Sequence, residues 1–173
     1  MGIDRVILVG FMGSGKSTVG RALADRLGWE LIDFDEEIER AQGRPIAEIF
    51  RQAGEAAFRR LEAQLTDRLR DRRNAVMAPG GGWMVRPDLV DTLRPGSLIV
   101  WLRARPETLY RRHLGQGVPR PLLAVERPRE AIDGILAERE AHYKKAHATV
   151  DTDEKDPATV ADEIVARLRL AAP

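Results

Sequence analysis

Short apolar runs alternate with amphipathic segments along the whole chain. The runs Arg5–Val9 and 97–102 are rich in Val, Ile and Leu and bounded by turn residues, a composition typical of strands buried on both faces. Elsewhere, apolar residues recur every three or four positions, as Phe58, Leu61 and Leu65 do, which is typical of a helix with one buried face. We therefore expect strands and helices to follow one another in turn.

This alternation predicts an α/β fold with three layers, in which helices cover both faces of a parallel sheet of about five strands. The least regular stretch, residues 115–121, contains two Gly and two Pro and predicts a mobile loop. The expected strands are 5–9, 29–33, 74–78, 97–102 and 148–150, and the expected helices are 19–27, 35–41, 46–53, 55–71, 86–93, 106–113, 127–146 and 157–170.

Composition narrows the class of protein. The chain has 173 residues and 43% apolar side chains, which fits one folded domain over residues 1–173. Its 28 basic residues, of which only four are lysines, nearly balance 27 acidic ones, so neither a nucleic acid nor a membrane surface is an expected partner. The absence of cysteine excludes disulfides and thiolate chemistry. Because the chain has no long apolar run and no secretory signal, we expect the protein to be located in the cytoplasm. We also expect it to be a monomer.

Residues 10–17 read Gly-Phe-Met-Gly-Ser-Gly-Lys-Ser and satisfy the pattern G-x-x-x-x-G-K-[ST] between an expected strand and an expected helix. Such a loop wraps a polyphosphate with its backbone N–H groups, above the positive end of the helix. Lys16 would reach the outer phosphates, and the Ser17 hydroxyl would bind Mg²⁺. The predicted ATP contacts in this loop are Gly13, Ser14, Gly15, Lys16, Ser17 and Thr18.

The loop alone indicates a nucleoside triphosphate and nothing finer. A GTPase switch, an ATPase motor domain and a small-molecule kinase all fit it.

Two aspartates follow the second expected strand. Asp33 and Asp35 lie at the carboxyl end of that strand, where open α/β sheets bind ligands. Because alternate residues point in different directions, one carboxylate could approach a metal and the other a substrate hydroxyl. Alternatively, Asp35 simply caps the helix that begins there.

Three further features are ambiguous when taken alone. Arg59 and Glu62 have the i, i+3 spacing that lets them pair on one helix face, either as part of an anion site or as a solvated surface pair. Gly80, Gly81 and Gly82 allow either close approach of a ligand to the backbone or a flexible turn. Arg120, in the expected mobile loop, is either a lid residue that neutralises phosphoryl charge or an ordinary surface cation.

Together these motifs resemble the shikimate kinase family, which belongs to the nucleoside-monophosphate-kinase-like P-loop group. The resemblance covers essentially the whole chain, and the order and spacing of its motifs are specific. The matching segments are the phosphate loop with Thr18, Val19 and Gly20; Asp33-x-Asp35-x-x-Ile38-Glu39; Gly54-Glu55-x-x-Phe58-Arg59-x-x-Glu62; Gly80-Gly81-Gly82; Arg120-Pro121-Leu122-Leu123; and Arg139-x-x-x-Tyr143.

The resemblance implies an enzyme of aromatic amino-acid biosynthesis that transfers the ATP γ-phosphoryl group to the 3-hydroxyl of shikimate, with Mg²⁺ as cofactor and a mobile lid at about 113–125. It also implies a role for each matching residue. Lys16, Asp35 and Arg120 would be catalytic; Asp35, Arg59, Gly81, Gly82 and Arg139 would bind shikimate; Ser17 would bind Mg²⁺ directly and Asp33 through water; and Arg112, Arg120 and Lys155 would complete the ATP site.

The chain departs from the family pattern at Phe34 and Trp83, where smaller residues are frequent, and at Ala78-Pro79, where a Ser or Thr is usual. We expect the first two to alter the lining of the acceptor pocket. Two rival functions remain open: another small-molecule kinase of this fold, acting on gluconate or a nucleoside monophosphate, and a catalytically idle nucleotide-binding regulator.

Overall fold

The computed structural model describes residues 2–116 and 121–171. Within these residues the structure has the five-stranded, all-parallel sheet that the sequence predicts, and its strand order is β2-β3-β1-β4-β5. The strands are β1 (Arg5–Val9), β2 (Glu30–Asp33), β3 (Ala75–Ala78), β4 (Ser97–Arg103) and β5 (Ala148–Asp151).

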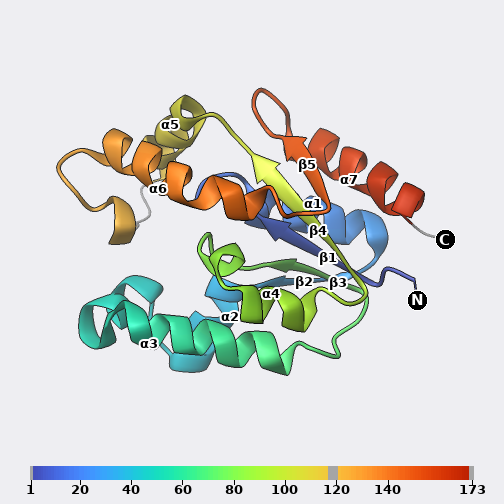
Figure 1. The fold of residues 1–173 in the computed structure, drawn as a ribbon, viewed down its shortest axis with the longest axis horizontal. Helices are drawn as coiled ribbons and strands as arrows, with labels where there is room; N and C mark the ends of the chain where they lie inside the picture. The colour runs from blue at the N-terminus through green and yellow to red at the C-terminus, as the bar shows by residue number, and fades with distance from the viewer. Residues whose placement is uncertain (1, 117–120, 172–173) are drawn as a thin grey trace.

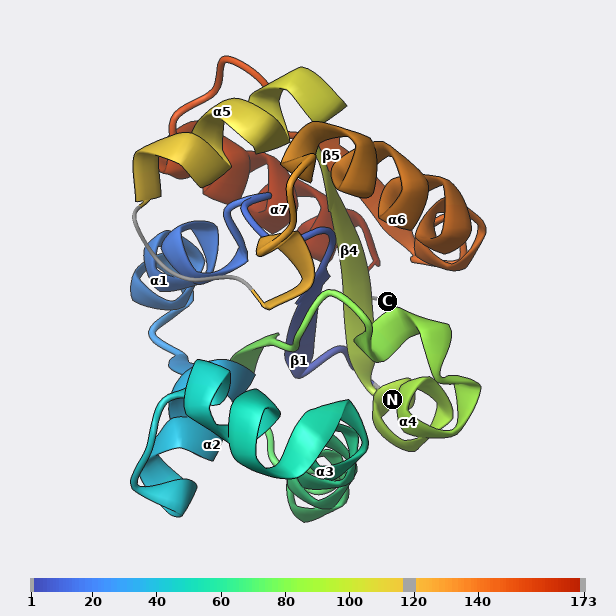
Figure 2. The ribbon, with the colours of Figure 1, turned by 90° about the vertical axis from the view of Figure 1, so that its left-hand side faces the viewer.

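Helices cover both faces of the sheet, which gives the expected three layers (Figures 1 and 2). The helices are α1 (Lys16–Leu27), α2 (Phe34–Gln42), α3 (Ile46–Arg68), α4 (Pro87–Leu93), α5 (Pro106–Gln116), α6 (Pro128–Tyr143) and α7 (Pro157–Ala171), with two 3-10 turns, η1 (Trp83–Val85) and η2 (Pro121–Leu123).

The two faces of the sheet form separate cores because side chains alternate along each strand. In β1, Val6 and Leu8 pack with α1 and α7, whereas Ile7 and Val9 pack with α2, α3, η1 and α4. All five residues of β1 are buried, which is why its sequence reads as a continuous run rather than an alternation.

The element boundaries differ from expectation in instructive ways. The helix α1 begins at Lys16, three residues earlier than its apolar pattern suggests, because its first turn belongs to the phosphate loop. The two helices expected over 46–53 and 55–71 form one element, α3, interrupted at Gly54 (φ 80°, ψ 172°). Glycine reaches this backbone conformation without the steric cost that a Cβ atom would bring.

Among the residues that the structure describes, no helix is both long enough and apolar enough to cross a membrane. The expected lid at 113–125 is described only at its two ends. The helix α5 continues through Gln116, and η2 begins at Pro121. Arg120 lies outside the described residues, so the position of this candidate side chain remains a prediction.

Candidate active site

The carboxyl ends of three neighbouring strands meet at one edge of the sheet. The phosphate loop follows β1, Asp33 is the last residue of β2, and residues 80–82, here called the glycine loop, come shortly after β3. Asp33 is in register with Ala78 at the end of β3. Parallel pairing therefore brings the segments that the sequence singles out to a single place.

Backbone carbonyls of the phosphate loop hold the side chain of Lys16. Lys16 Nζ donates hydrogen bonds to the carbonyls of Gly10 and Phe11, both at 2.9 Å. A Cβ atom at Gly10 would lie 2.6 Å from the Leu102 carbonyl oxygen, so a larger residue cannot stand there. Ser14 is buried, and its Oγ has no hydrogen-bond partner within the described chain. The Ser14 hydroxyl is thus packed inside the loop, beside Gly10.

Asp33 joins the phosphate loop to the start of α2. Its Oδ2 accepts a hydrogen bond from the Ser17 hydroxyl, and its Oδ1 accepts from the backbone N–H of Asp35 at 3.0 Å. Glu36 N–H lies 3.4 Å from the same oxygen. The residue that caps α2 is thus Asp33, and the alternative in which Asp35 is the cap is wrong.

The oxygens of Ser17 and Asp33 fit a Mg²⁺ ion. Hydroxyl and carboxylate oxygens are the hard ligands that Mg²⁺ prefers, and Mg²⁺ in nucleotide sites takes few protein ligands because water and phosphate oxygens complete its shell. Accordingly, the described residues contain no cluster of three or more His, Cys, Asp or Glu side chains that could hold a metal by itself.

A cavity of about 790 Å³ lies beside the phosphate loop. It is bounded by α2, both parts of α3, the glycine loop, η2 and α6. Every acceptor-binding residue that the sequence proposes lines this one cavity, together with both proposed metal residues: Ser17, Asp33, Asp35, Arg59, Gly81, Gly82 and Arg139.

Arg59 enters the cavity from α3 between two carboxylates. Its Nη1 donates to Glu62 Oε2 at 2.6 Å, and its Nη2 and Nε donate to Glu55 Oε1 at 3.0 and 3.3 Å. Glu62 is fully buried, so this pair is not the solvated surface pair of the alternative interpretation. Phe58 lies under the same guanidinium, 5.4 Å from its carbon to the ring centroid.

Burial and charge act against each other in this pair. Burial raises the pKa of the Glu62 carboxyl above its usual value, although the Arg59 guanidinium lowers it, and the nearby Asp35 carboxylate adds to the rise. For Arg59, partial burial lowers the pKa, but Glu62 and Glu55 together raise it above the ordinary value. Arg59 thus stays a cation inside the cavity wall.

The glycine loop lies between the two arginines. A Cβ atom at Gly82 would be 3.0 Å from both Nη atoms of Arg59, and one at Gly81 would be 3.0 Å from Arg139 Nη1. The Tyr143 hydroxyl donates to the Gly81 carbonyl at 2.6 Å. Gly81 and Gly82 therefore allow the two arginines to approach the loop closely, and Gly80 does the same for Glu62, whose Oε1 would lie 2.5 Å from a Cβ atom there.

Arg139 comes from α6, on the opposite side of the cavity from Arg59. Its Nη1 is buried and has no hydrogen-bond partner within the described residues. An unpaired buried N–H donor is costly, and an anionic ligand would satisfy it.

Two residues that the resemblance assigns to the ATP site lie farther along the sheet edge. Arg112, on α5, donates to the carbonyls of Gly13 at 3.1 Å and Thr152 at 3.0 Å, and so ties the phosphate loop to the segment after β5. Partial burial lowers the pKa of its guanidinium. Lys155, in that segment, pairs with Glu163 of α7 at 2.7 Å.

The expectation that Phe34 and Trp83 alter the lining of the acceptor pocket is wrong. Both side chains are fully buried in the core between the sheet and α3, and neither lines the cavity. The lining residues to which sequence reasoning gave no role in the site include Phe50, Phe58 and Arg51. A signal was present for two of them, since Phe50 and Phe58 are large apolar residues flanking Gly54, and their ring centroids lie 4.9 Å apart.

Comparisons with known proteins agree with the fold and the motifs. The family model for shikimate kinase matches residues 12–169. A shikimate kinase of Moorella thermoacetica is 44% identical over 164 residues, covering 95% of this chain and 94% of the relative. The structure of a shikimate kinase from Acinetobacter baumannii in complex with shikimate superposes with a TM-score of 0.92 at 35% identity, covering 97% of this chain and 94% of that one.

A gluconokinase structure from Sinorhizobium meliloti also matches, with a TM-score of 0.66 at 24% identity over 98% of this chain and 94% of that one. At that identity the likeness concerns the fold alone.

Proposed function

The chain belongs to the shikimate kinase family, and we propose that it transfers the γ-phosphoryl group of ATP to the 3-hydroxyl of shikimate. The observation that carries this proposal is the cavity beside the phosphate loop, where Asp35, Arg59, Arg139 and the glycine loop line one volume. A small acid with several hydroxyl groups needs arginines for its carboxylate and a carboxylate for its reacting hydroxyl.

In this proposal, Arg59 and Arg139 hold the carboxylate of shikimate from opposite sides, with Gly81 and Gly82 close enough to contact it through their backbones. Asp35 orients the reacting hydroxyl and accepts its proton as the oxygen attacks the γ-phosphorus. The approach of oxygen and phosphorus is then set by the spacing between this cavity and the phosphate loop.

On the nucleotide side, the phosphate loop binds the polyphosphate with its N–H groups, and Lys16 exchanges its two carbonyl partners for phosphate oxygens. Mg²⁺, held by Ser17 and through water by Asp33, would neutralise phosphate charge when bound. Arg112 and Lys155 border the adenosine, and Arg120 approaches the phosphates from a lid. We further propose that the protein works as a cytoplasmic monomer.

A panel of acceptors tests the proposed function. ADP release is measured in a coupled assay with ATP, Mg²⁺ and either shikimate, gluconate, AMP, CMP or no acceptor. Shikimate is expected to raise the rate at least about 100-fold above the rate without acceptor, because its ring holds a carboxylate and a hydroxyl at a fixed separation, so that the arginines and Asp35 can bind both at once. A preference for gluconate or a nucleotide would favour another kinase, and no stimulation by any acceptor would favour the idle regulator.

A further inference from the structure

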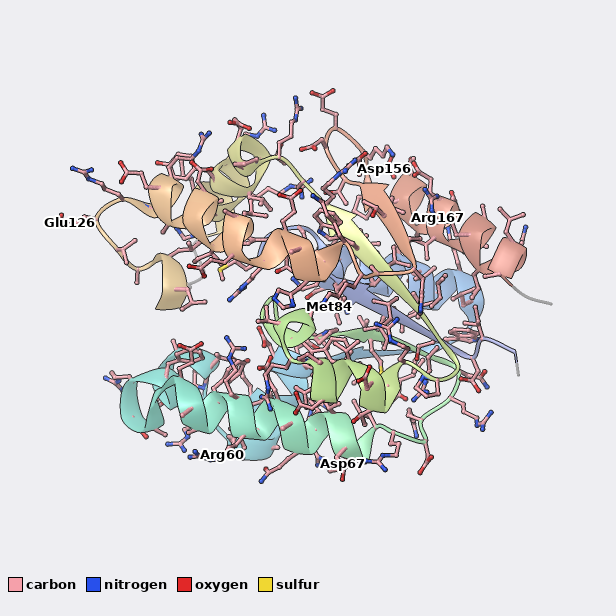
Figure 3. The ribbon with its side chains drawn as sticks, in the orientation of Figure 1. Arg60, Asp67, Met84, Glu126, Asp156 and Arg167 are labelled. Atoms are coloured by element: carbon pink, nitrogen blue, oxygen red, sulfur yellow. The ribbon has the colours of Figure 1, made fainter. Side chains whose placement is uncertain are left out.

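Trp83 lies directly behind the glycine loop and points away from the cavity. Its backbone N–H donates to the Gly80 carbonyl at 3.0 Å, and Val85 N–H donates to the Gly82 carbonyl at 3.2 Å. The glycine loop and η1 therefore form one hydrogen-bonded unit. Figure 3 shows η1, where Met84 is labelled, between α6 and α4 at the centre of the molecule.

A buried polar chain connects this unit to α3. The Trp83 indole Nε1 donates to Thr66 Oγ1 at 3.1 Å, and the Thr66 hydroxyl donates to the Glu62 carbonyl at 2.8 Å. Trp83, Thr66 and Glu62 are all buried, so water cannot replace either bond. The chain ends on the same residue whose carboxylate holds Arg59.

A second connection runs from the same turn to the same helix. Arg86, directly after η1, donates from Nη1 to the Arg59 carbonyl at 3.1 Å. Trp83 and Arg86 thus each donate a hydrogen bond to α3, one to the Thr66 hydroxyl and one to the Arg59 carbonyl.

The tolerance for movement between α3 and the glycine loop is small. A Cβ atom at Gly80 would lie 2.5 Å from Glu62 Oε1, and one at Gly82 would lie 3.0 Å from the Arg59 guanidinium nitrogens. A shift of a few tenths of an ångström between the two elements would therefore change how a ligand meets Arg59 and the loop together.

We propose that Trp83 and Thr66 are positioning residues for the acceptor, because their hydrogen bond sets the distance between the glycine loop and Arg59. The large residue at 83 then acts on acceptor binding from behind the loop, without touching the acceptor. This inference rests on the proposed function for the identity of the acceptor, but the geometry of the connection does not depend on it.

Two variants that keep the shape of the core test the proposal. Thr66→Val removes the hydroxyl at nearly constant volume, and Trp83→Phe removes the indole N–H. Each is expected to raise the KM for shikimate about fivefold, the scale of one net hydrogen bond, with kcat and the KM for ATP changed less than about twofold. Because both variants remove the same bond, the double variant is expected to be no worse than about fivefold. Thr66→Ser keeps the hydroxyl and is expected to restore the wild-type KM.

The matched controls remove similar groups elsewhere. Thr92→Val deletes a hydroxyl that makes the same bond to the carbonyl four residues earlier, at 2.8 Å, in α4. Trp29→Phe alters an indole that packs on the α1 and α7 side of the sheet. Neither is expected to change the KM for shikimate. A lower melting temperature with an unchanged KM in both test variants, or strictly additive effects in the double variant, would overturn the proposal.

Amide hydrogen exchange separates this inference from the proposed function. In both test variants the amides of Trp83 and Val85, which donate to the carbonyls of Gly80 and Gly82, are expected to exchange about fivefold faster than in the wild type, with no acceptor present. If the wild-type protein does not phosphorylate shikimate, the proposed function is wrong. The exchange measurement still tests whether the hydrogen bond between Trp83 and Thr66 holds the glycine loop in place. Unchanged exchange at these amides overturns the inference even if shikimate is the acceptor.

Discussion

The two walls of the acceptor cavity hold their arginines in different ways, one with carboxylate partners and one beside the Tyr143 hydroxyl. On the α3 wall, Arg59 is bonded to Glu55 and to the buried Glu62. On the α6 wall, Arg139 has a buried Nη1 with no hydrogen-bond partner in the described chain. Arg59 is held by two carboxylates before a ligand arrives, whereas Arg139 lies beside the Tyr143 hydroxyl and keeps one buried donor that a ligand would satisfy.

The two arginines therefore contribute to ligand binding in different ways: Arg59 orients the ligand, and Arg139 attracts it. A guanidinium has five N–H groups; three of those in Arg59 are used by the carboxylates, so two remain for a ligand, in a direction that the ion pairs fix. Holding the side chain in place lowers the entropy lost on binding. The unpaired donor of Arg139 instead makes the unliganded cavity less stable than the liganded one.

The largest effect is expected at the residue that belongs to neither wall. If both walls only hold the acceptor, the phosphoryl transfer itself depends on Asp35. Asp35→Asn is therefore expected to lower kcat at least about 100-fold, because the amide that replaces the carboxylate cannot accept the hydroxyl proton. The KM for shikimate and the affinity for ATP are expected to change less than about threefold. Steady-state kinetics with ATP titration measure all three.

Glu36→Gln is the matched control, because Glu36 follows Asp35 on α2 and lines the same cavity. Its kcat is expected to stay within about twofold of the wild type. An Asp35→Asn enzyme with normal kcat would remove the general base from this site, and a loss confined to KM would make Asp35 part of the binding walls.

The sequence predicts those features of the site that depend on one short segment, and does not predict those that depend on contacts between distant segments. The phosphate loop and the strand ends are local patterns, so the placement of Lys16, Ser17 and Asp33 at one edge follows from parallel pairing alone. The state of each arginine is not local. Whether Arg59 is exposed or held depends on Glu62 being buried against the glycine loop, about twenty residues away in the chain, and no pattern in either segment contains that contact.

The same reasoning explains the error at residues 34 and 83. Positions beside site motifs suggest pocket lining, but a strand end or a tight turn sends neighbouring side chains to opposite sides. Phe34 and Trp83 turn into the core, while Asp33, Asp35 and Gly82 face the cavity.

The second prediction compares the walls directly. Arg59→Gln and Arg139→Gln are each expected to raise the KM for shikimate about 30-fold, the scale of a lost charge-assisted contact. Their effects on stability are expected to differ. Arg59→Gln leaves the buried Glu62 without its cation and is expected to lower the free energy of unfolding by about 2 kcal/mol. Arg139→Gln breaks no ion pair among the described residues and is expected to lower it by less than about 0.5 kcal/mol.

Urea unfolding of the unliganded proteins measures the difference. Arg60→Gln is the control, because Arg60 is the exposed neighbour of Arg59 on α3 and does not line the cavity. It is expected to match the wild type in both KM and stability. Equal destabilisation by the two cavity variants would mean that the walls do not differ in the way described.

The smallest expected effect is on how the free energy of unfolding changes with pH, because Glu62 is buried in the α3 wall. Because the pKa of this carboxyl is higher in the folded protein than its usual 4.5, the folded state takes up a proton at a pH where the unfolded chain does not. The wild type is therefore expected to gain free energy of unfolding relative to Glu62→Gln as the pH falls through the folded pKa towards 4.5, by about 1.4 kcal/mol for each unit of difference between the two pKa values. The difference between the two proteins is expected to level off below about pH 4.

Urea unfolding at a series of pH values from 7 downwards, within the pH range where both proteins fold reversibly, gives this difference. Arg139→Gln is expected to run parallel to the wild type, because the described structure pairs no carboxylate with Arg139. Parallel curves for Glu62→Gln and the wild type would contradict the prediction, since they would mean that the attraction of Arg59 fully offsets the burial of its partner. In that case the α3 wall would hold its arginine at no electrostatic cost, and the contrast with the α6 wall would lie in geometry alone.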